Sequence, residues 1–163
     1  LTFNVGNAES NGVEFDFTSM ITDNWTLSGA ASFLESELVE DYRRSASSPE
    51  PDAPAGSRLP RVPEVKWNVS TRYTFANDWF AQAAYMYTGD SYNDLFGGFR
   101  QLQGSYDVVN ASFGLERSNW TAELYVQNLT DERGDVWIND VNWDERVTIN
   151  QPRTIGFRWQ QRF

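Results

Sequence analysis

Few side chains in this sequence of 163 residues are suited to covalent chemistry, because it contains neither cysteine nor histidine. It therefore offers no thiol nucleophile, disulfide framework, cysteine or histidine zinc ligand, or Ser-His-Asp triad. Glu14 and Asp16 are a possible carboxylate pair. Residues i and i+2 of a strand stand side by side, however, whereas glycoside hydrolysis needs carboxylates on opposite sides of the sugar. We predict no catalytic residue.

A second group of carboxylates raises the question of a metal site. Asp140, Asn142, Asp144 and Glu145 carry oxygens of the kind that calcium prefers. The rest of an EF-hand loop is missing around them, and a solvated acidic loop is the favoured interpretation. We predict no metal site and no cofactor.

The composition excludes several classes of protein. With 13 Lys plus Arg against 23 Asp plus Glu, the net charge is −10. A chain of this charge does not provide the basic surface that nucleic-acid binding requires. Aromatic residues make up 15% of the chain although the mean hydropathy is −0.58. A disordered acidic chain would be poor in aromatics. No segment approaches the roughly 20 apolar residues of a membrane-spanning helix.

Hydrophobic periodicity predicts the secondary structure and places Glu14 and Asp16 on a strand. Apolar and polar residues alternate in seven runs of about ten residues, which predicts strands and no helix. The runs are 12–21, 25–33, 65–75, 79–87, 109–116, 120–127 and 155–163.

The connections alternate in length. Those after runs one, three and five are short (22–24, 76–78 and 118–119), and those after runs two, four and six are long (35–64, 89–105 and 129–151). Short turns at one end of the strands and long loops at the other are typical of an outer-membrane β-barrel.

Charge follows the same plan. Within the strands, every charged residue lies opposite the apolar face: Glu14, Asp16, Lys66, Arg72, Glu116, Glu123, Arg158 and Arg162. A charge facing lipid at mid-depth costs about 2 to 4 kcal/mol, whereas a water-filled lumen tolerates it. Segments 35–55 and 129–150 each carry six acids and two bases, a net charge of −4 apiece. We expect these loops to hold most of the negative charge.

Three tryptophans occupy equivalent positions. Trp25, Trp79 and Trp120 each open a strand directly after a short turn. Amphipathic rings favour the membrane interface. We therefore predict an aromatic girdle at this rim.

These features, together with a series of short motifs, resemble TonB-dependent outer-membrane receptors. The motifs are Gly12-Val13-Glu14, Arg58-Leu59-Pro60 with Val62-Pro63, Tyr87-Thr88-Gly89-Asp90, Ser105-Tyr106-Asp107-Val108-Val109-Asn110, Val126-Gln127-Asn128-Leu129-Thr130-Asp131 and Pro152-Arg153-Thr154-Ile155-Gly156-Phe157 before a terminal Phe163. Their order and spacing match the C-terminal part of the family's 22-stranded barrel. The expected fold is an all-β, antiparallel, up-and-down transmembrane barrel, with residues 1–163 forming its C-terminal part and the plug and earlier strands absent from this chain.

The resemblance implies an active-transport receptor of a Gram-negative bacterium rather than an enzyme. Such a receptor imports a scarce nutrient, such as a ferric siderophore, a similar chelate or a carbohydrate, with energy from TonB. It implies outer-membrane lipid, the TonB complex through the missing N-terminal part, the barrel-assembly machinery and a small nutrient as partners. The long loops would be extracellular and the girdle and C-terminus periplasmic. The assembly signal would be Ile155, Phe157, Trp159 and Phe163.

Ligand contacts are expected from the long loops, because loops on a rigid scaffold carry binding. Aromatic rings stack on sugars or catecholates, and arginine pairs with anions. Packing between the loops is the alternative role for each candidate. The candidates are Tyr42, Arg43, Arg44, Tyr92, Phe96, Phe99, Arg100, Trp137, Trp143 and Arg146.

Two other functions remain open from the sequence. One is a different outer-membrane barrel, such as a passive porin or a barrel enzyme, which an upstream plug domain would exclude. The other is a soluble β-sandwich that binds carbohydrate. That fold requires the apolar faces of the strands to be buried against each other.

Overall fold

A computed structural model gives the fold of the chain. It describes the backbone of residues 6–98, 100–141 and 144–163, and the side chains of these residues except those of 140–145. Phe99, Asn142 and Trp143 lie outside the described residues, as do the side chains of Asp140, Asp144 and Glu145.

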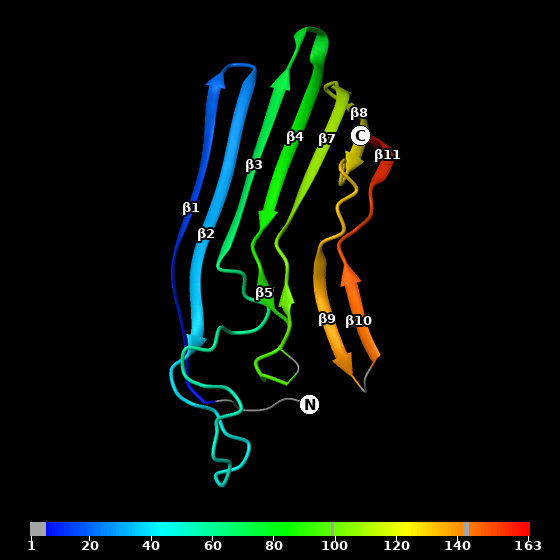
Figure 1. Cartoon of the computed structure of the whole chain (residues 1–163). Coiled ribbons are helices and arrows are strands. Elements are labelled where there is room, and N and C mark those ends of the chain that lie inside the picture. Colours follow the sequence, from blue (N-terminus) through cyan, green and yellow to red (C-terminus); the bar gives the residue numbers. More distant parts are fainter. Residues whose placement is uncertain (1–5, 99, 142–143) are drawn as a thin grey trace.

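Seven antiparallel strands form one sheet, and each strand pairs with its neighbours in chain order (Figure 1). The strands are β1 (Ala8–Thr22), β2 (Trp25–Leu38), β3 (Val65–Thr74), β4 (Trp79–Thr88), β7 (Tyr106–Glu116), β8 (Trp120–Gln127) and β11 (Thr154–Gln161). They correspond to the seven runs of alternating residues, so the predicted up-and-down arrangement is confirmed. β1 and β2 are longer than the alternation indicated and continue as a paired ribbon to Ala8 and Leu38.

The register aligns the apolar positions of all seven strands on one face. Phe17, Gly29, Val69 and Tyr85, for example, form one row across β1 to β4. These apolar side chains are exposed: the exposed fraction is 59% for Phe15, 61% for Leu124 and 75% for Ile155. A soluble sandwich would cover such a face with a second sheet. In the described part of the chain nothing covers it.

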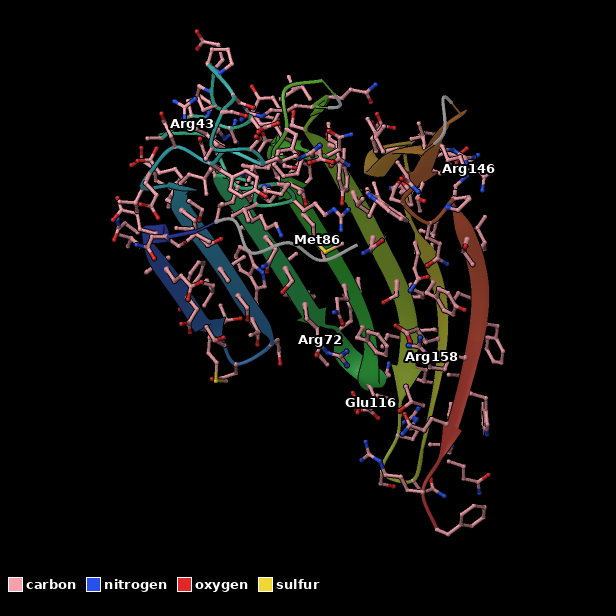
Figure 2. The ribbon with its side chains drawn as sticks, turned by 90° about the horizontal axis from the view of Figure 1, so that it is seen from below. Arg43, Arg72, Met86, Glu116, Arg146 and Arg158 are labelled. Carbon is pink, nitrogen blue, oxygen red and sulfur yellow. The ribbon has the colours of Figure 1, made fainter. Side chains whose placement is uncertain are left out.

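The opposite face is polar, and ion pairs cross it (Figure 2). Arg72 on β3 reaches over β4 to Glu116 on β7, with 2.7 Å between nitrogen and oxygen. Arg158 on β11 pairs with Glu123 on β8 at 2.8 Å. Each of these charged side chains has a partner of opposite charge, which favours the charged form of both. We call this surface the polar face.

Aromatic rings on the polar face lie over glycines of the next strand. Phe80, which is 2% exposed, covers Gly114. The guanidinium carbon of Arg72 lies 3.9 Å from the centre of the Phe80 ring. Tyr125 covers Gly156 in the same way, with Arg158 5.0 Å from its ring centre. A side chain at either glycine would occupy the space of the ring.

The three short turns lie together at one end of the sheet, which we call the turn end, at the top of Figure 1. The turn between β3 and β4 is a single 3-10 turn, η1 (Ala76–Asp78), in which Asn77 and Asp78 have positive φ. Trp25, Trp79 and Trp120 begin β2, β4 and β8 at this end. Trp79 stacks on Phe113 and Trp120 on Trp159, so these rings also tie adjacent strands together.

The long connections contain four strands that the sequence pattern did not reveal. β9 (Asp135–Val141) and β10 (Asp144–Ile149) form a hairpin in the third connection. β5 (Ser91–Tyr92) and β6 (Leu102–Gln103) form a two-residue ladder in the second. The third connection therefore contains a hairpin that its charge did not indicate. Among the described residues, no helix has the length and apolar character needed to cross a bilayer.

Candidate functional site

The long connections gather at the end of the sheet opposite the turns (Figure 1). We call residues 39–64, 89–105 and 128–153 the loop cap. All ten predicted ligand residues fall within these ranges. Three groups of contacts hold the described part of the loop cap together.

The first group joins the first and second connections through a small apolar core. Leu38 and Ala53 are 1% exposed and Leu95 is 6% exposed. Tyr42 and Phe96 pack against this core with their ring centres 5.6 Å apart. Arg44 lies 4.0 Å above the Phe96 ring. Three predicted ligand residues, Tyr42, Arg44 and Phe96, therefore meet in one cluster.

The second group is centred on Arg58, which was not among the predicted site residues. Its guanidinium lies 2.8 Å from Glu64 and 3.0 Å from Asp90, and it also donates to the backbone oxygen of Asp90. It is 5.4 Å from the ring centre of Tyr92, and Arg100 is 3.7 Å from the same ring. Predicted residues Tyr92 and Arg100 are thus neighbours. Arg58 fastens the second connection to the first.

The third group attaches the β9–β10 hairpin to the other two connections. Arg61 lies 5.1 Å from the ring centre of Trp137. The side chains of Asn93 and Gln103 donate to the backbone oxygens of Ile138 and Asp135. Each of these bonds is 3.4 Å long, which is near the limit for a hydrogen bond. These two bonds are longer than the ion pair by which Arg58 joins the first two connections.

Other predicted residues do not join these clusters. Arg43 donates to the backbone oxygens of Ser48 and Pro49 and pairs with Asp41, all within its own loop. Arg146 is on β10, and Figure 2 shows it on the opposite side of the loop cap from Arg43. Among the described candidates, five therefore form two clusters, and Arg43 and Arg146 lie on opposite sides of the loop cap. The ring of Phe99 and the indole of Trp143 lie outside the described residues.

Asn128 closes the base of the third connection and was quoted only as part of a motif. It is 2% exposed, with φ of 53°. Its side-chain nitrogen donates to the backbone oxygens of Glu132 and Gln151, and its side-chain oxygen accepts from the backbone nitrogen of Glu132. Its own backbone nitrogen donates to the side chain of Asn110 on β7. One amide thus joins both ends of the connection to the sheet.

Asp131 reinforces this closure. Its carboxylate accepts a hydrogen bond from the backbone nitrogen of Arg153 at 2.8 Å and pairs with Arg133 at 3.0 Å. The bond from Arg153, followed by the bond from Arg133, lowers the pKa of Asp131 below its ordinary value. The charged form of Asp131 is the one that the closed loop stabilises.

Several cavities lie against the polar face. One of about 410 Å³ is lined by residues of β1 to β4, including Glu14, Asp16 and Met86. Another of about 400 Å³ is bordered by Asn110, Asn128 and Gln151. Met86 lies in the middle of the sheet in Figure 2. Among the described residues, no group of three or more acidic side chains is placed to hold a metal ion. The cavities and the loop cap together suit the binding of a molecule at the loop end of the polar face.

Comparison with known proteins identifies the family. The family model described as "TonB dependent receptor-like, beta-barrel" matches residues 1–129. The chain belongs to this family of TonB-dependent transport receptors, as its motifs predicted.

Two curated relatives carry more specific descriptions. A probable TonB-dependent siderophore receptor, PiuA of Acinetobacter baumannii, is 26% identical over 133 residues, which cover 80% of this chain and 18% of PiuA. The metal-pseudopaline receptor CntO of Pseudomonas aeruginosa is 28% identical over 145 residues, covering 82% of this chain and 19% of CntO. The chain thus spans about a fifth of the length of these relatives.

Solved structures show the same fold. The siderophore receptor PiuA from Acinetobacter baumannii superposes with a TM-score of 0.76 at 22% identity, covering 93% of this chain and 21% of that receptor. The ferric yersiniabactin uptake receptor FyuA from Yersinia pestis also gives 0.76, at 21% identity, with 96% and 24% covered. The seven-stranded sheet is therefore a portion of a larger TonB-dependent receptor barrel.

Proposed function

We propose that the protein containing this chain is an outer-membrane receptor that imports a scarce nutrient with energy from TonB. The single observation that carries the proposal is the two-sided sheet. One face exposes aromatic and aliphatic side chains to the surroundings, and the other pairs its charges across strands. A lipid surface outside and an aqueous lumen inside account for both faces.

The substrate we favour is a ferric siderophore or a similar metal chelate. The relatives PiuA and CntO are described as siderophore and metal-pseudopaline receptors, which supports this choice. A carbohydrate is the second candidate, because aromatic rings in the loop cap, such as that of Trp137, suit sugar faces as well as catecholates. In either case the protein binds and moves its substrate without making or breaking a bond, so it is not an enzyme.

The proposed orientation puts the loop cap outside the cell and the turn end in the periplasm. Trp25, Trp79 and Trp120 then mark the periplasmic interface, and Ile155, Phe157, Trp159 and Phe163 act as the signal for the barrel-assembly machinery. The N-terminal part of the full protein supplies the plug and the contact with TonB. The proposed ligand-facing clusters are Tyr42, Arg44 and Phe96 in one group and Tyr92 and Arg100 in the other. The individual candidates are Arg43, Phe99, Trp137, Trp143 and Arg146.

Uptake of radiolabelled iron tests the proposal. A strain that lacks the receptor gene is compared with the complemented strain on a panel of ferric siderophores, each in the presence and absence of TonB. We expect at least one chelate to enter only when both the receptor and TonB are present. Uptake that needs the receptor but not TonB would indicate a passive porin. No receptor-dependent uptake of any chelate, combined with TonB-dependent uptake of an oligosaccharide, would support the carbohydrate substrate instead.

A further inference from the structure

A further cavity of about 200 Å³ lies where the polar face meets the loop cap. It adjoins the two cavities described above, because Lys66 and Thr88 also line the cavity of about 410 Å³ and Thr88 and Tyr106 also line that of about 400 Å³. All three long connections and three strands of the main sheet contribute to it. Its lining includes Arg61, Lys66, Thr88, Tyr106 and Asp135. Pockets that enclose a whole drug-sized ligand measure about 300 to 1,000 Å³. This cavity has the size for one chemical group of a larger ligand.

Three of the lining side chains form a single row. Lys66 on β3 is in register with Thr88 on β4, and Thr88 is in register with Tyr106 on β7. Partners in register on adjacent strands project from the same face, and the strands are about 4.8 Å apart. An ammonium, a hydroxyl and a phenol, all of which donate hydrogen bonds, therefore stand next to one another on the polar face.

These donors have no acceptor within the described part of the chain. The side chains of Lys66, Thr88 and Tyr106 make no hydrogen bond or ion pair there, and the guanidinium of Arg61 makes no ion pair there but lies over the ring of Trp137. Several other cations of the sheet and its connections pair with carboxylates, among them Arg58, Arg72 and Arg158. In a protein with net charge −10, two cations that lack a carboxylate partner among the described residues are unexpected at one cavity.

One carboxylate limits the charge of the cavity. Asp135 lines it, and its side chain makes no bond to either Arg61 or Lys66 within the described residues. Two cations against one anion leave an excess of one positive charge. A group with a single negative charge and several acceptor oxygens matches this balance and the row of donors.

We propose that this cavity, the donor pocket, is a subsite that binds a carboxylate group of the transported ligand. Lys66, Thr88 and Tyr106 donate to the carboxylate oxygens, Arg61 adds positive charge at the edge, and Asp135 opposes additional negative charge. This inference rests on the proposed function and deepens it, because it assigns the substrate to the class of carboxylate-bearing chelates.

Ligand-detected NMR on the full-length receptor in detergent tests the donor pocket, with citrate as the probe and trimethyl citrate as its uncharged counterpart. We expect wild-type receptor to bind citrate but not the ester. Lys66→Met keeps the length of the side chain without its charge and should weaken citrate binding about tenfold or more. Arg61→Gln should weaken it less. The matched control is Arg117→Gln, whose guanidinium pairs with Asp78 at the turn end, and it should bind citrate as wild type does.

Asp135→Asn gives an expectation of opposite sign. Removing the negative charge of Asp135, which repels citrate, should tighten citrate binding. A purely structural role of Asp135 would not produce this increase. Equal binding of citrate and its ester, unchanged binding in Lys66→Met, or weaker binding in Asp135→Asn would overturn the donor pocket. The uptake experiment tests the proposed function independently of the donor pocket. The proposed function is wrong if no substrate enters in a TonB-dependent manner, whatever the outcome with citrate.

Discussion

At the scale of single residues, Asn128 holds the two ends of the third connection together. Its buried amide satisfies backbone groups at both ends of the third connection, and its positive φ is one that asparagine adopts more readily than most residues. From the sequence alone, Asn128 is noticed only as part of the motif 126–131, without a structural role. Its partners, Glu132 and Gln151, are separated by the whole β9–β10 hairpin, so no local pattern connects them.

Asn128→Asp should loosen the base of the third connection. Aspartate has nearly the same shape but cannot donate to the oxygens of Glu132 and Gln151, which leaves two partly buried acceptors without this donor at a cost of about 1 kcal/mol each. The free energy of unfolding, measured by urea titration of the full-length receptor in lipid vesicles, should fall. Asn119→Asp, at an exposed turn, is the control and should have little effect. Equal stability of wild type and Asn128→Asp would contradict this role.

Asp131 makes the same closure sensitive to acid. Because the folded-state pKa is lowered, the carboxylate contributes stability above its ordinary pKa of about 4, and that stability is lost as the pH falls through the folded value. Pepsin cleavage of the third connection should therefore accelerate below about pH 4. Asp131→Asn should remove this step in the pH profile. A profile that is identical in the variant would assign the acid sensitivity to another group.

At the scale of elements, aromatic rings on the polar face pack closely over glycines of the neighbouring strand. A Cβ atom at Gly114 would stand 2.5 Å from the backbone oxygen of Ala122 and 2.7 Å from the Phe80 ring, so backbone as well as ring would have to move. Tyr106 lies over Gly134 in the same way at the loop end. The glycines within the alternating runs are therefore positions of close packing.

Gly114→Ala should destabilise the sheet by about 1 to 3 kcal/mol, the usual cost of overpacking. The measurement is the temperature at which the folded receptor loses its heat-modifiable migration on a gel. Gly97→Ala is the matched control, because a Cβ atom there would meet nothing within 4 Å. If both substitutions lowered the transition equally, the glycine packing would not be the cause.

The strands were predictable from sequence because period two is a local signal that a half-exposed sheet preserves. The contacts within the loop cap were not predictable from sequence. Its core residues Leu38, Ala53 and Leu95 are far apart in the chain and meet only after the connections have folded together. The hairpin β9–β10 was hidden because its acidic residues suggested a solvated loop. Residue types indicated where a ligand binds, but Arg58 and Arg61 could be recognised only from their partners in space.

At the scale of the whole molecule, the surroundings of each face decide which substitutions are tolerated. Leu124 is 61% exposed on the apolar face of β8, and Ser112 lies on the polar face of β7. Leu124→Lys should lower the stability of the receptor in lipid vesicles by about 2 to 4 kcal/mol, whereas Ser112→Lys should cost much less. Both are measured by urea titration in vesicles. An equal loss for the two variants would mean that the apolar face does not contact lipid.

The central claim is that this sheet crosses the outer membrane with its loop cap outside the cell, and accessibility of single cysteines tests it most directly. The chain has no cysteine of its own, so each introduced thiol reports on one position. In intact cells that express the full-length receptor, a membrane-impermeant maleimide should label Ala46→Cys, at an exposed position of the loop cap. Asp23→Cys at the turn end should react only after the outer membrane is permeabilised. Labelling of Asp23→Cys in intact cells, or of both positions equally, would contradict the account.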